Sequence, residues 1–431
     1  MLYNFILEKI VLPVGDLIFG YSFIKELDNW RSIQELSAKE ISELQERNLR
    51  GLLQHATRNV PYYRNRNIPF NENPYEWIKN FPILRKSDIK ENINAITSGN
   101  KDKLLPHVGS GSSGIQCTVY LDKKEESIAN AIQMLWWEWS GYKIGDKLIQ
   151  TGMTPNRGLI KSLKDYFFRT KYVAAYDYSE AFIVKILETA ERSSGFSLAG
   201  YASSLFPIAL IARKRKKEGI RFKTVIAWGD KLFPHYRKAI EETFSTRVYE
   251  TYGCVEGLRI AAQKDLEYMY IMSPHIYLEI VDEKGVEVPD GEMGYVLVTR
   301  LDGYSMPLIR YYLGDLAIKL PEEKYPKHRE LNFPILQKVI GRDTDIVRTR
   351  SGKFVIVHFF TGIFEHIPEI KQFKVTQYNL DGVTIEFIRD KNFSLEILTR
   401  IKNQILGYIK EPFKIDFVEV QEIKASPSGK P

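Results

Sequence analysis

The chain has 431 residues, of which 44% are hydrophobic and 27% are charged, and its formal net charge is +7. This composition is that of a globular protein with two or three domains, and it excludes the disordered and fibrous classes. The positive charge is spread along the sequence and mildly favours an anionic partner, either a small phosphorylated molecule or nucleic acid. The two cysteines, Cys117 and Cys254, exclude a disulfide framework and are typical of a reducing cytosol, so we expect a cytoplasmic protein.

The first 24 residues are rich in apolar side chains, but Glu8, Lys9 and Asp16 interrupt them. No uncharged run approaches the ~20 residues of a membrane-spanning helix, and no signal-peptide cleavage pattern stands out. We expect a packed N-terminal helix here. The alternative is loose attachment of this segment to a membrane surface.

Apolar residues recur at helical spacing from Ser37 to Arg58, which predicts a helix that ends before Pro61. A short strand is expected at 118–121, followed by a helix over residues 124–140. That helix carries three tryptophans within four positions, Trp136, Trp137 and Trp139. They cannot all face one way, so they divide between an apolar pocket wall and the core or surface.

In the middle of the chain, short apolar runs alternate with helical ones, which is typical of α/β layering. Buried strands are expected at 148–150, 225–227 and 247–249. From Ile276 onward the pattern is that of β-structure, with strands at 277–281 and 294–299. The expected fold class is therefore α/β with a β-rich part.

The last part of the chain has its own pattern. Two β-prone runs at 373–377 and 383–388 flank Asp381-Gly382, a strong hairpin signal. A helix is expected over 394–408 and a strand over 414–420. We therefore predict two domains, an N-terminal one over residues 1–342 and a small α+β one over 343–431.

One dense basic run, Arg213 to Lys217, follows an apolar stretch and precedes Gly219. Cations at that place complement the dipole at the end of a helix, so we expect a solvated last helical turn. The alternatives are a nuclear signal or a nucleic-acid patch. Aromatic residues are not interleaved with basic ones in any stripe, which argues against a nucleic-acid partner.

The stretch from Val108 to Gly114 holds three glycines and three serines, with β-prone residues on both sides. Such a loop brings backbone N–H groups and hydroxyls close around an anion. It carries no positive charge, so it would hold a polyphosphate with dipoles and hydroxyl donors alone. The alternative is a plain flexible turn.

Four further motifs follow this loop in order. They are Tyr252-Gly253-Cys254-Val255-Glu256, Arg310-Tyr311-Tyr312-Leu313-Gly314-Asp315, Gly341-Arg342-Asp343-Thr344-Asp345 and Ser428-Gly429-Lys430. Together with the loop they resemble the adenylate-forming superfamily of acyl-CoA synthetases, peptide-synthetase adenylation domains and luciferases. The resemblance covers nearly the whole chain.

Within the superfamily the chain is similar to the phenylacetate–CoA ligase branch, especially the CapK-type members associated with capsular polysaccharide synthesis. The N-terminal motifs that carry this similarity lie at 52–56, 60–64 and 81–86. The resemblance implies a large N-terminal domain of layered α/β sheets with a β-rich subdomain, and a small mobile C-terminal domain.

The activity that the resemblance implies uses ATP, Mg²⁺ and a small carboxylic acid. The carboxylate attacks the α-phosphorus of ATP, pyrophosphate leaves, and an acyl- or aryl-adenylate forms. The thiol of coenzyme A then displaces AMP. An alternative acceptor is an amine or hydroxyl on a glycan or nucleotide sugar, and a further alternative is a nucleotide-binding protein that has lost catalysis.

The resemblance also implies the roles of single residues. The β- and γ-phosphates would be held by the loop residues Ser110, Gly111, Ser112, Ser113 and Gly114. Tyr252, followed by Gly253, would stack on adenine, and the turn at Gly229 and Asp230 would lie against it. Glu256 would hold Mg²⁺, a role suited to a carboxylate oxygen.

Three residues nearer the C-terminus complete the implied site. Asp315 would accept hydrogen bonds from the ribose hydroxyls, Arg342 would sit near the ribose or phosphate, and Lys430 would reach the substrate carboxylate and the α-phosphate. The structural alternatives are a core aromatic at Tyr252 and a surface carboxylate at Glu256. For the other three they are a turn aspartate, a surface salt bridge and a frayed terminal lysine.

The chain departs from the family pattern at several places. Gln116 and Cys117 stand where the phosphate loop often continues into proline and lysine, and Val255 replaces a threonine. Thr344 stands at the usual hinge residue. His275 has no accompanying cysteine after Cys254, so we expect no complete zinc site.

Overall fold

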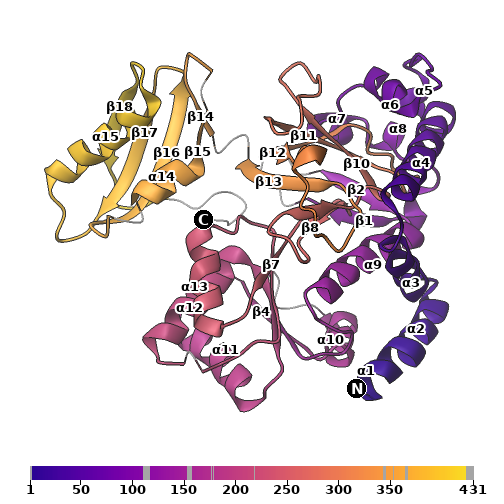
Figure 1. Cartoon of the computed structure of the whole chain (residues 1–431), viewed down its shortest axis with the longest axis horizontal. Coiled ribbons are helices and arrows are strands. Elements are labelled where there is room, and N and C mark those ends of the chain that lie inside the picture. The colour runs from indigo at the N-terminus through magenta and orange to yellow at the C-terminus, as the bar shows by residue number, and fades with distance from the viewer. Residues whose placement is uncertain are drawn as a thin grey trace. The chain divides into compact units, whose positions relative to one another are not determined.

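The computed structural model of the chain describes residues 2–109, 117–152, 158–175, 177, 179–217, 219–342, 346–352, 354–364 and 367–423. These residues divide into two compact units. The first contains the described residues up to Leu313 together with 317–338, and the second contains 314–316 and the described residues from Val339 onward (Figure 1). Ser110, Gly111, Ser112, Ser113, Gly114, Gln116, Thr344 and Lys430 lie outside the described residues.

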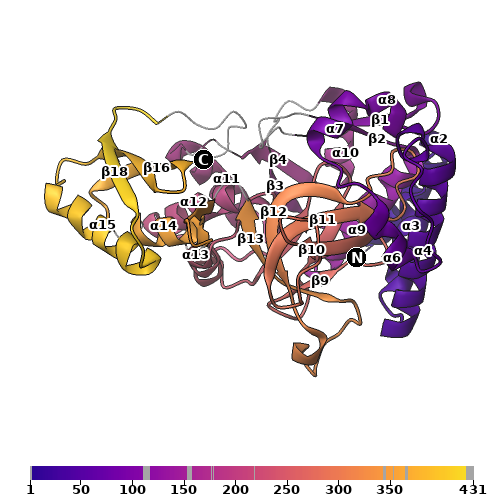
Figure 2. The same ribbon diagram turned by 90° about the horizontal axis from the view of Figure 1, so that it is seen from above.

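The first unit begins with helices. They are α1 (Leu2–Ile6), the π-helical η1 (Leu7–Val11), α2 (Leu12–Phe19), α3 (Phe23–Ile33) and α4 (Ala38–Asn59). The helix expected from Ser37 is confirmed as α4, because Ser37 and Glu40 form a capping box at its start. Gln45 of α4 donates to the carbonyl oxygens of Ser273 and Ile276, which places α4 against the β-rich part of the unit (Figure 2). In the described part of the chain, no helix combines the length and apolar character needed to cross a membrane.

Short helices then lead to a hairpin. The helices are α5 (Pro61–Arg64), α6 (Pro74–Trp77), η2 (Ile78–Asn80), α7 (Lys86–Glu91), α8 (Ile93–Ile96) and η3 (Lys101–Lys103). Strands β1 (Leu105–Val108) and β2 (Thr118–Leu121) pair antiparallel on either side of the glycine–serine loop. The helix that follows, α9 (Lys123–Trp139), begins at a capping box of Asp122 and Glu125 and carries the three tryptophans, as expected.

A large mixed sheet runs through the first unit in the order β10-β11-β12-β13-β9-β8-β7-β6-β5-β3-β4. Its parallel part comprises β3 (Leu148–Gly152), β4 (Thr170–Ala174), β5 (Ser197–Tyr201), β6 (Val225–Trp228) and β7 (Val248–Gly253). The crossover helices are α10 (Gly158–Phe167), α11 (Glu180–Arg192), α12 (Ala202–Lys214) and α13 (Pro234–Phe244). The basic run ends α12 as expected, and Lys214 and Arg215 pair there with Glu180.

The β-rich part confirms the change of pattern after Ile276. Its strands are β8 (Arg259–Ala262), β9 (Met269–Ile271), β10 (Ile276–Val281), β11 (Met293–Arg300), β12 (Tyr311–Lys319) and β13 (Ile335–Arg342), with η4 (Glu322–Lys324) between the last two. β7 pairs antiparallel with β8, so the sheet changes from parallel to mixed at β7. The α/β fold class with a β-rich part is thereby confirmed.

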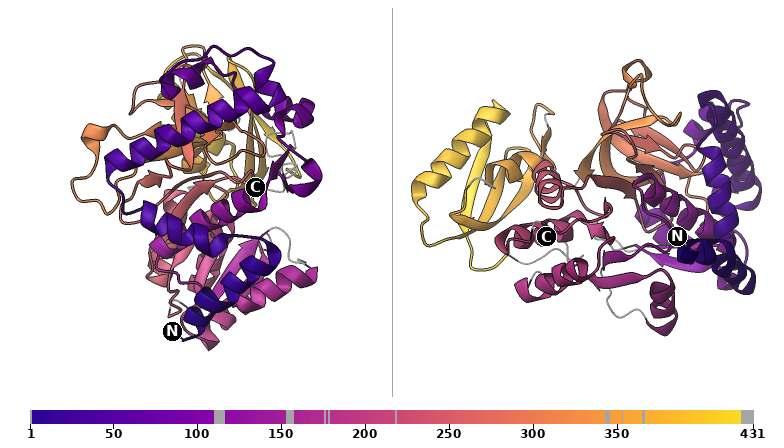
Figure 3. Two further views of the ribbon diagram at one scale, coloured as in Figure 1. Left: turned by 90° about the vertical axis from the view of Figure 1, so that its right-hand side faces the viewer. Right: turned by 60° about the horizontal axis from the view of Figure 1, so that its bottom comes forward.

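Alternation along the parallel strands distributes their side chains to two cores. Leu148, Ala199 and Ile226 pack with α3 and α9 on one face. Their neighbours Ile149, Leu198 and Val225 pack with α11, α12 and α13 on the other (Figure 3). Successive strand residues point to opposite faces, so strands buried on both sides read as continuous apolar runs in the sequence.

The second unit has its own core. It contains β14 (Ile346–Arg348), β15 (Phe354–Ile356), α14 (Val357–Phe364), β16 (Ile370–Asn379), β17 (Gly382–Arg389), α15 (Leu395–Ile409) and β18 (Lys414–Glu419). β16 and β17 form the hairpin that Asp381-Gly382 predicted, and β17 pairs parallel with β18. The apolar side of α15, at Ile397, Ile401 and Ile405, packs onto this sheet.

A buried ion pair in the β-rich part also holds the segment around Lys79 and Phe81. Arg310, 6% exposed, donates from Nε to Glu279 Oε1 at 3.0 Å, and Glu279 is 1% exposed. The other guanidinium nitrogens donate to the carbonyl oxygens of Lys79, Phe81 and Gly285. Burial raises the pKa of Glu279 to about 7, although the positive charge of Arg310 opposes that shift.

Removing one partner of this pair should leave a buried polar group without compensation. We expect Arg310→Met to lower the free energy of unfolding by about 3–5 kcal/mol, and Glu279→Leu combined with Arg310→Met to recover part of that loss. Equilibrium unfolding in urea measures both. Lys39→Met is the matched control, because Lys39 and Glu43 form an exposed pair, for which a loss below about 1 kcal/mol is expected. Equal losses of unfolding free energy for Arg310→Met and Lys39→Met would contradict this account.

Candidate active site

The candidate site is built on the carboxyl ends of three neighbouring parallel strands. Tyr201 ends β5 and pairs in register with Trp228, which ends β6. β6 in turn pairs parallel with β7, which ends at Tyr252 and Gly253. Loops that leave the same edge of a parallel sheet are the usual ligand-binding place in open α/β folds. The structure therefore brings the Gly229 turn and the Tyr252 motif to one edge.

The turn after β6 depends on its glycine. Gly229 has φ +78°, and a Cβ there would lie 2.5 Å from Cε1 of Tyr201. Asp230 follows and accepts hydrogen bonds from the backbone N–H groups of Ala202 and Ser203, at 2.6 and 3.3 Å. Its carboxylate thus lies at the N-terminus of α12, where the helix dipole favours negative charge. Asp230 has a clear structural role in addition to the nucleotide contact expected of it.

The motif after β7 turns sharply between Cys254 and Leu258. The Cys254 N–H donates to the Leu258 carbonyl at 3.0 Å, and a Cβ on Gly253 would lie 2.5 Å from that oxygen. Gly257 has φ +79°, and a Cβ there would lie 2.5 Å from Nη1 of Arg300. Two positions of this turn therefore require glycine, and the turn directs Glu256 into the unit.

Glu256 is a buried carboxylate, only 4% exposed, and not the surface group that was the structural alternative. Its Oε1 accepts a hydrogen bond from Tyr311 Oη at 3.1 Å. Among the described residues, no lysine, arginine or histidine forms an ion pair with it. Burial and the nearby Glu256 charge raise the pKa of Cys254 and that of Cys117. A buried carboxylate compensated by neutral neighbours alone fits a divalent cation.

The base of the glycine–serine loop lies at this carboxylate. The Gly109 N–H donates to the Cys117 carbonyl at 3.0 Å and closes the loop. A Cβ on Gly109 would lie 3.4 Å from Oε1 of Glu256. Two segments more than a hundred residues apart in the sequence thus meet; the five predicted phosphate-binding residues lie outside the described residues.

Asp315 and Arg342 are brought together within the second unit. Asp315 is 8% exposed, and its Oδ1 accepts from Nε of Arg342 at 3.1 Å. The salt bridge that was the structural alternative for Arg342 is therefore present. Its partner, Asp315, is itself predicted to bind the ribose. Val255 is 51% exposed, so the position where the family usually has a threonine is open to solvent.

No protein-family model matches the sequence. Protein CapK of Staphylococcus aureus is 22% identical over 369 residues, which cover 82% of this chain and 79% of CapK. Phenylacetate-coenzyme A ligase of Pseudomonas putida is 29% identical over 170 residues, which cover 37% of this chain and 36% of the ligase. The chain is thus similar in sequence to proteins of the branch that its motifs indicated.

Solved structures show the same fold. 2-Hydroxyisobutyryl-CoA ligase in the postadenylation state matches with a TM-score of 0.69 at 17% identity, over 91% of this chain and 89% of the ligase. The amide bond synthetase McbA of Marinactinospora thermotolerans matches with a TM-score of 0.50 at 18% identity, over 77% and 67%.

The sequence similarity to CapK and phenylacetate-coenzyme A ligase, and the fold shared with 2-hydroxyisobutyryl-CoA ligase, agree with the adenylate-forming superfamily that the motifs indicated.

Behind the Glu256 turn lies a buried charged network that the sequence reasoning missed. Arg300 donates from Nε to Asp302 at 2.7 Å, and Asp302 accepts from Nδ1 of His275. Nε2 of His275 accepts from the Arg259 N–H at 3.3 Å, just after the turn. Arg300 also donates to the Glu125 carbonyl at 2.8 Å, and the Glu125 side chain accepts from the Ser305 N–H. The His275 ring nitrogens are thereby both engaged in holding the turn.

The sequence suggests only one role for His275, that of a ligand in a zinc site that we expected to be incomplete. In the described residues, no group of three or more His, Cys, Asp and Glu side chains is arranged to hold a metal ion. The sequence does carry a signal for the structural role, because Arg300 ends a buried strand, Asp302 follows it closely, and charged residues there need partners. Their partner His275, however, lies far away in the sequence, in the turn before β10.

All three tryptophans of α9 are buried and belong to one core cluster, so the apolar pocket wall stays a prediction. Trp137 stacks on Trp228 at the end of β6, with ring centroids 5.8 Å apart and 12° between the planes. Trp139 donates from Nε1 to Gln34 and meets Tyr270 edge-on in the core. The Trp137–Trp228 pair thus lies beside the Gly229 turn, with Trp137 buried and Trp228 partly buried.

The network predicts how stability depends on pH. Burial lowers the pKa of His275 below its ordinary value of about 6.5, against the Asp302 charge and with the help of Arg300 and Arg259. The folded His275 stays neutral while the unfolded one gains a proton, so stability is lost as pH falls through about 6.5. His275 and Arg300 lower the pKa of Asp302 to about 2, so its contribution is lost only in stronger acid, from about pH 4 towards 2.

We therefore expect the free energy of unfolding to fall between pH 7.5 and 5.5, by at most about 1.4 kcal/mol per pH unit for this single group. His275→Gln should flatten that dependence while lowering stability at pH 7.5. Urea unfolding at a series of pH values measures both. His328→Gln serves as the control, because His328 is exposed. An unchanged pH profile in His275→Gln would contradict the assignment of a neutral buried histidine.

Proposed function

We propose that this protein activates a carboxylic acid with ATP to form an acyl- or aryl-adenylate, and transfers the acyl group to coenzyme A. The observation that carries the proposal is the meeting of Gly109, Cys117 and Glu256 at the base of the glycine–serine loop. This observation puts Gly109 and Cys117, which flank the predicted anion-binding loop, next to a buried carboxylate near the strand end that carries Tyr252. The similarity to phenylacetate-coenzyme A ligase in sequence and to 2-hydroxyisobutyryl-CoA ligase in fold supports the same activity.

In the first step, a carboxylate oxygen of the acid forms a bond to the α-phosphorus of ATP, and the bond to the pyrophosphate oxygen breaks. Ser110, Ser112 and Ser113 with the backbone of Gly111 and Gly114 hold the β- and γ-phosphates. Glu256 holds Mg²⁺, which when bound offsets the negative charge of the phosphates. Tyr311 orients Glu256 through the hydrogen bond to Oε1. Lys430 offsets charge between the carboxylate and the α-phosphate.

The nucleotide and the acid are positioned by the strand ends. Tyr252 stacks on adenine, and the Gly229–Asp230 turn lies against it. Asp315 accepts from the ribose hydroxyls, and its ion pair with Arg342 fixes the orientation of the carboxylate. The Trp137–Trp228 pair forms an apolar wall for the acyl group. In the second step the CoA sulfur attacks the acyl carbon, AMP leaves, and residues 343–431 turn as a mobile domain near Gly341, whose φ is +140°.

Pyrophosphate exchange tests the first step. Labelled pyrophosphate should enter ATP only when a suitable acid is present, and Glu256→Gln should reduce that rate at least about a hundredfold. The isosteric amide keeps the buried volume but loses the charge that holds Mg²⁺. Glu292→Gln is the control, because Glu292 is exposed on the same unit. Calorimetric ATP binding without exchange over a broad acid panel would instead favour a nucleotide-binding protein that has lost catalysis, to which the exposed Val255 also points.

The acceptor is tested separately. With adenylate formed beforehand, CoA should release AMP stoichiometrically and give a thioester, because the thiol is the stronger nucleophile near neutral pH. The second candidate, an amine or hydroxyl acceptor on a glycan or nucleotide sugar, is favoured by two likenesses, to CapK and to the fold of an amide bond synthetase. AMP release by amino sugars and not by CoA, measured by chromatography, would replace CoA by that acceptor.

A further inference from the structure

The N-terminal segment of the chain turns its apolar side chains outward. Between Leu2 and Phe19, only Leu7 is buried. Leu17 is 84% exposed, Leu2 74% and Ile18 69%. The other exposed large apolar residues of the segment are Tyr3, Phe5, Ile6, Ile10, Val11, Val14 and Phe19. An exposed apolar surface of this extent is uncommon on a globular protein and indicates an interaction site.

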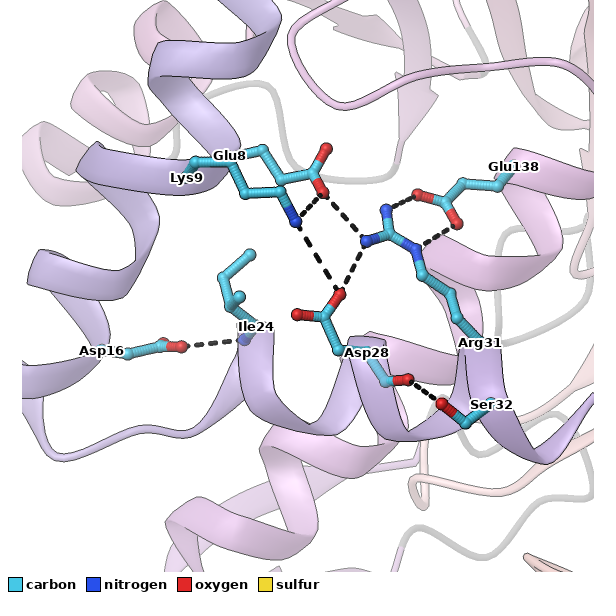
Figure 4. A network of polar contacts seen from close by, with 8 residues as sticks. All are labelled: Glu8, Lys9, Asp16, Ile24, Asp28, Arg31, Ser32 and Glu138. Atoms are coloured by element: carbon cyan, nitrogen blue, oxygen red, sulfur yellow. Dashed lines mark hydrogen bonds and ion pairs between the residues drawn. The ribbon is translucent and has the colours of Figure 1, made fainter.

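The polar side chains of the same segment point inward. Asn4 donates to Asp146 at 2.8 Å, and Glu8 accepts from Arg31 at 2.9 Å. Asp16 accepts from the Ile24 N–H at 2.9 Å. Figure 4 shows Glu8 and Asp16 pointing toward α3, whose Arg31 faces Glu8 and also pairs with Glu138 at the end of α9. The segment is therefore held to the protein by charges and hydrogen bonds, the reverse of an ordinary amphipathic helix.

The outward residues form one continuous stripe. The spacing of Leu2, Ile6, Ile10, Val14 and Ile18 is four residues at each step. Residues four apart lie above one another on a helix, so the stripe runs along α1, η1 and α2. The inward contacts fix the rotation of these helices about their axes, and the stripe consequently cannot turn into the core.

A second helix extends this surface. Tyr3 donates from Oη to the Phe167 carbonyl at 2.6 Å, and the Arg169 guanidinium lies 5.0 Å from the centre of the Tyr3 ring. These contacts place α1 next to the C-terminal end of α10. Leu163, Tyr166 and Phe167 of α10 are exposed at i, i+3 and i+4. The segment 158–171 also carries four basic residues, Lys161, Lys164, Arg169 and Lys171, against one acidic residue, Asp165.

We propose that this surface, the exposed apolar residues of α1, η1, α2 and α10, docks the protein onto an anionic lipid bilayer. Aromatic and aliphatic side chains flanked by lysine and arginine are the composition of a helix that lies in the membrane interface. A second copy of the chain is the poorer partner, because a two-fold contact would bring the basic α10 segment towards its own copy. The proposal does not depend on the proposed function.

Vesicle sedimentation of the full chain tests the proposal. The protein should bind vesicles of phosphatidylcholine with phosphatidylglycerol, and bind pure phosphatidylcholine more weakly. Leu17→Asp with Ile18→Asp should lower the partition coefficient at least about tenfold, since two apolar side chains that enter the membrane interface are lost. Leu17→Phe with Ile18→Phe should retain binding. Leu395→Asp is the matched control, because Leu395 is 77% exposed but lies on the second unit.

The charge contribution is measured in the same assay. Lys164→Glu should lower binding to the anionic vesicles at least about fivefold, and added salt should weaken the wild type. Pyrophosphate exchange should be unchanged in all these variants, which separates this proposal from the proposed function. No vesicle binding, binding unaffected by Leu17→Asp with Ile18→Asp, or a wild-type dimer that these substitutions dissociate without any vesicle binding would each overturn the proposal.

Discussion

The buried contact between Arg300, Asp302 and His275 is the interaction on which the candidate site depends. Arg300 reaches both the Glu125 carbonyl at the start of α9 and the space beside Gly257, while His275 holds the backbone of Arg259. The turn that carries Glu256 is thereby held on its C-terminal side. A buried charge is costly unless it is paired and hydrogen-bonded, so these groups hold one arrangement and transmit it to the turn.

Under the proposed function, the position of Glu256 explains how the uncharged glycine–serine loop binds a polyphosphate. A loop without positive charge binds a polyphosphate weakly by itself, whereas a cation held on a buried carboxylate at its base supplies the missing charge. Tyr311 stabilises that carboxylate through a neutral hydrogen bond, which leaves its charge available to a metal ion. Under the proposed function, burial therefore serves the first half-reaction and not the stability of the fold.

The N-terminal segment shows how one apolar pattern is compatible with two opposite arrangements. The sequence predicted a packed helix, and Leu7 does pack beneath Gly145. The stripe from Leu2 to Ile18 nevertheless faces outward, because Asn4, Glu8 and Asp16 find polar partners on the inner side. Partners such as Asp146 and Arg31 lie in other elements, so no local periodicity reveals which face is inside.

The sequence by itself determined most of the elements and their class. Capping at Ser37, the Asp381-Gly382 hairpin and the continuous apolar runs at 148–150 and 225–227 depend on residues close in the chain, and the structure confirms them. The order of the motifs indicated the resemblance to the adenylate-forming superfamily. Only the tertiary structure decided that Glu256 is buried beside Gly109, that His275 holds a turn, that Arg342 pairs with Asp315 and that the N-terminal stripe faces outward. Each of these depends on contacts between residues far apart in sequence, which neither periodicity nor spacing encodes.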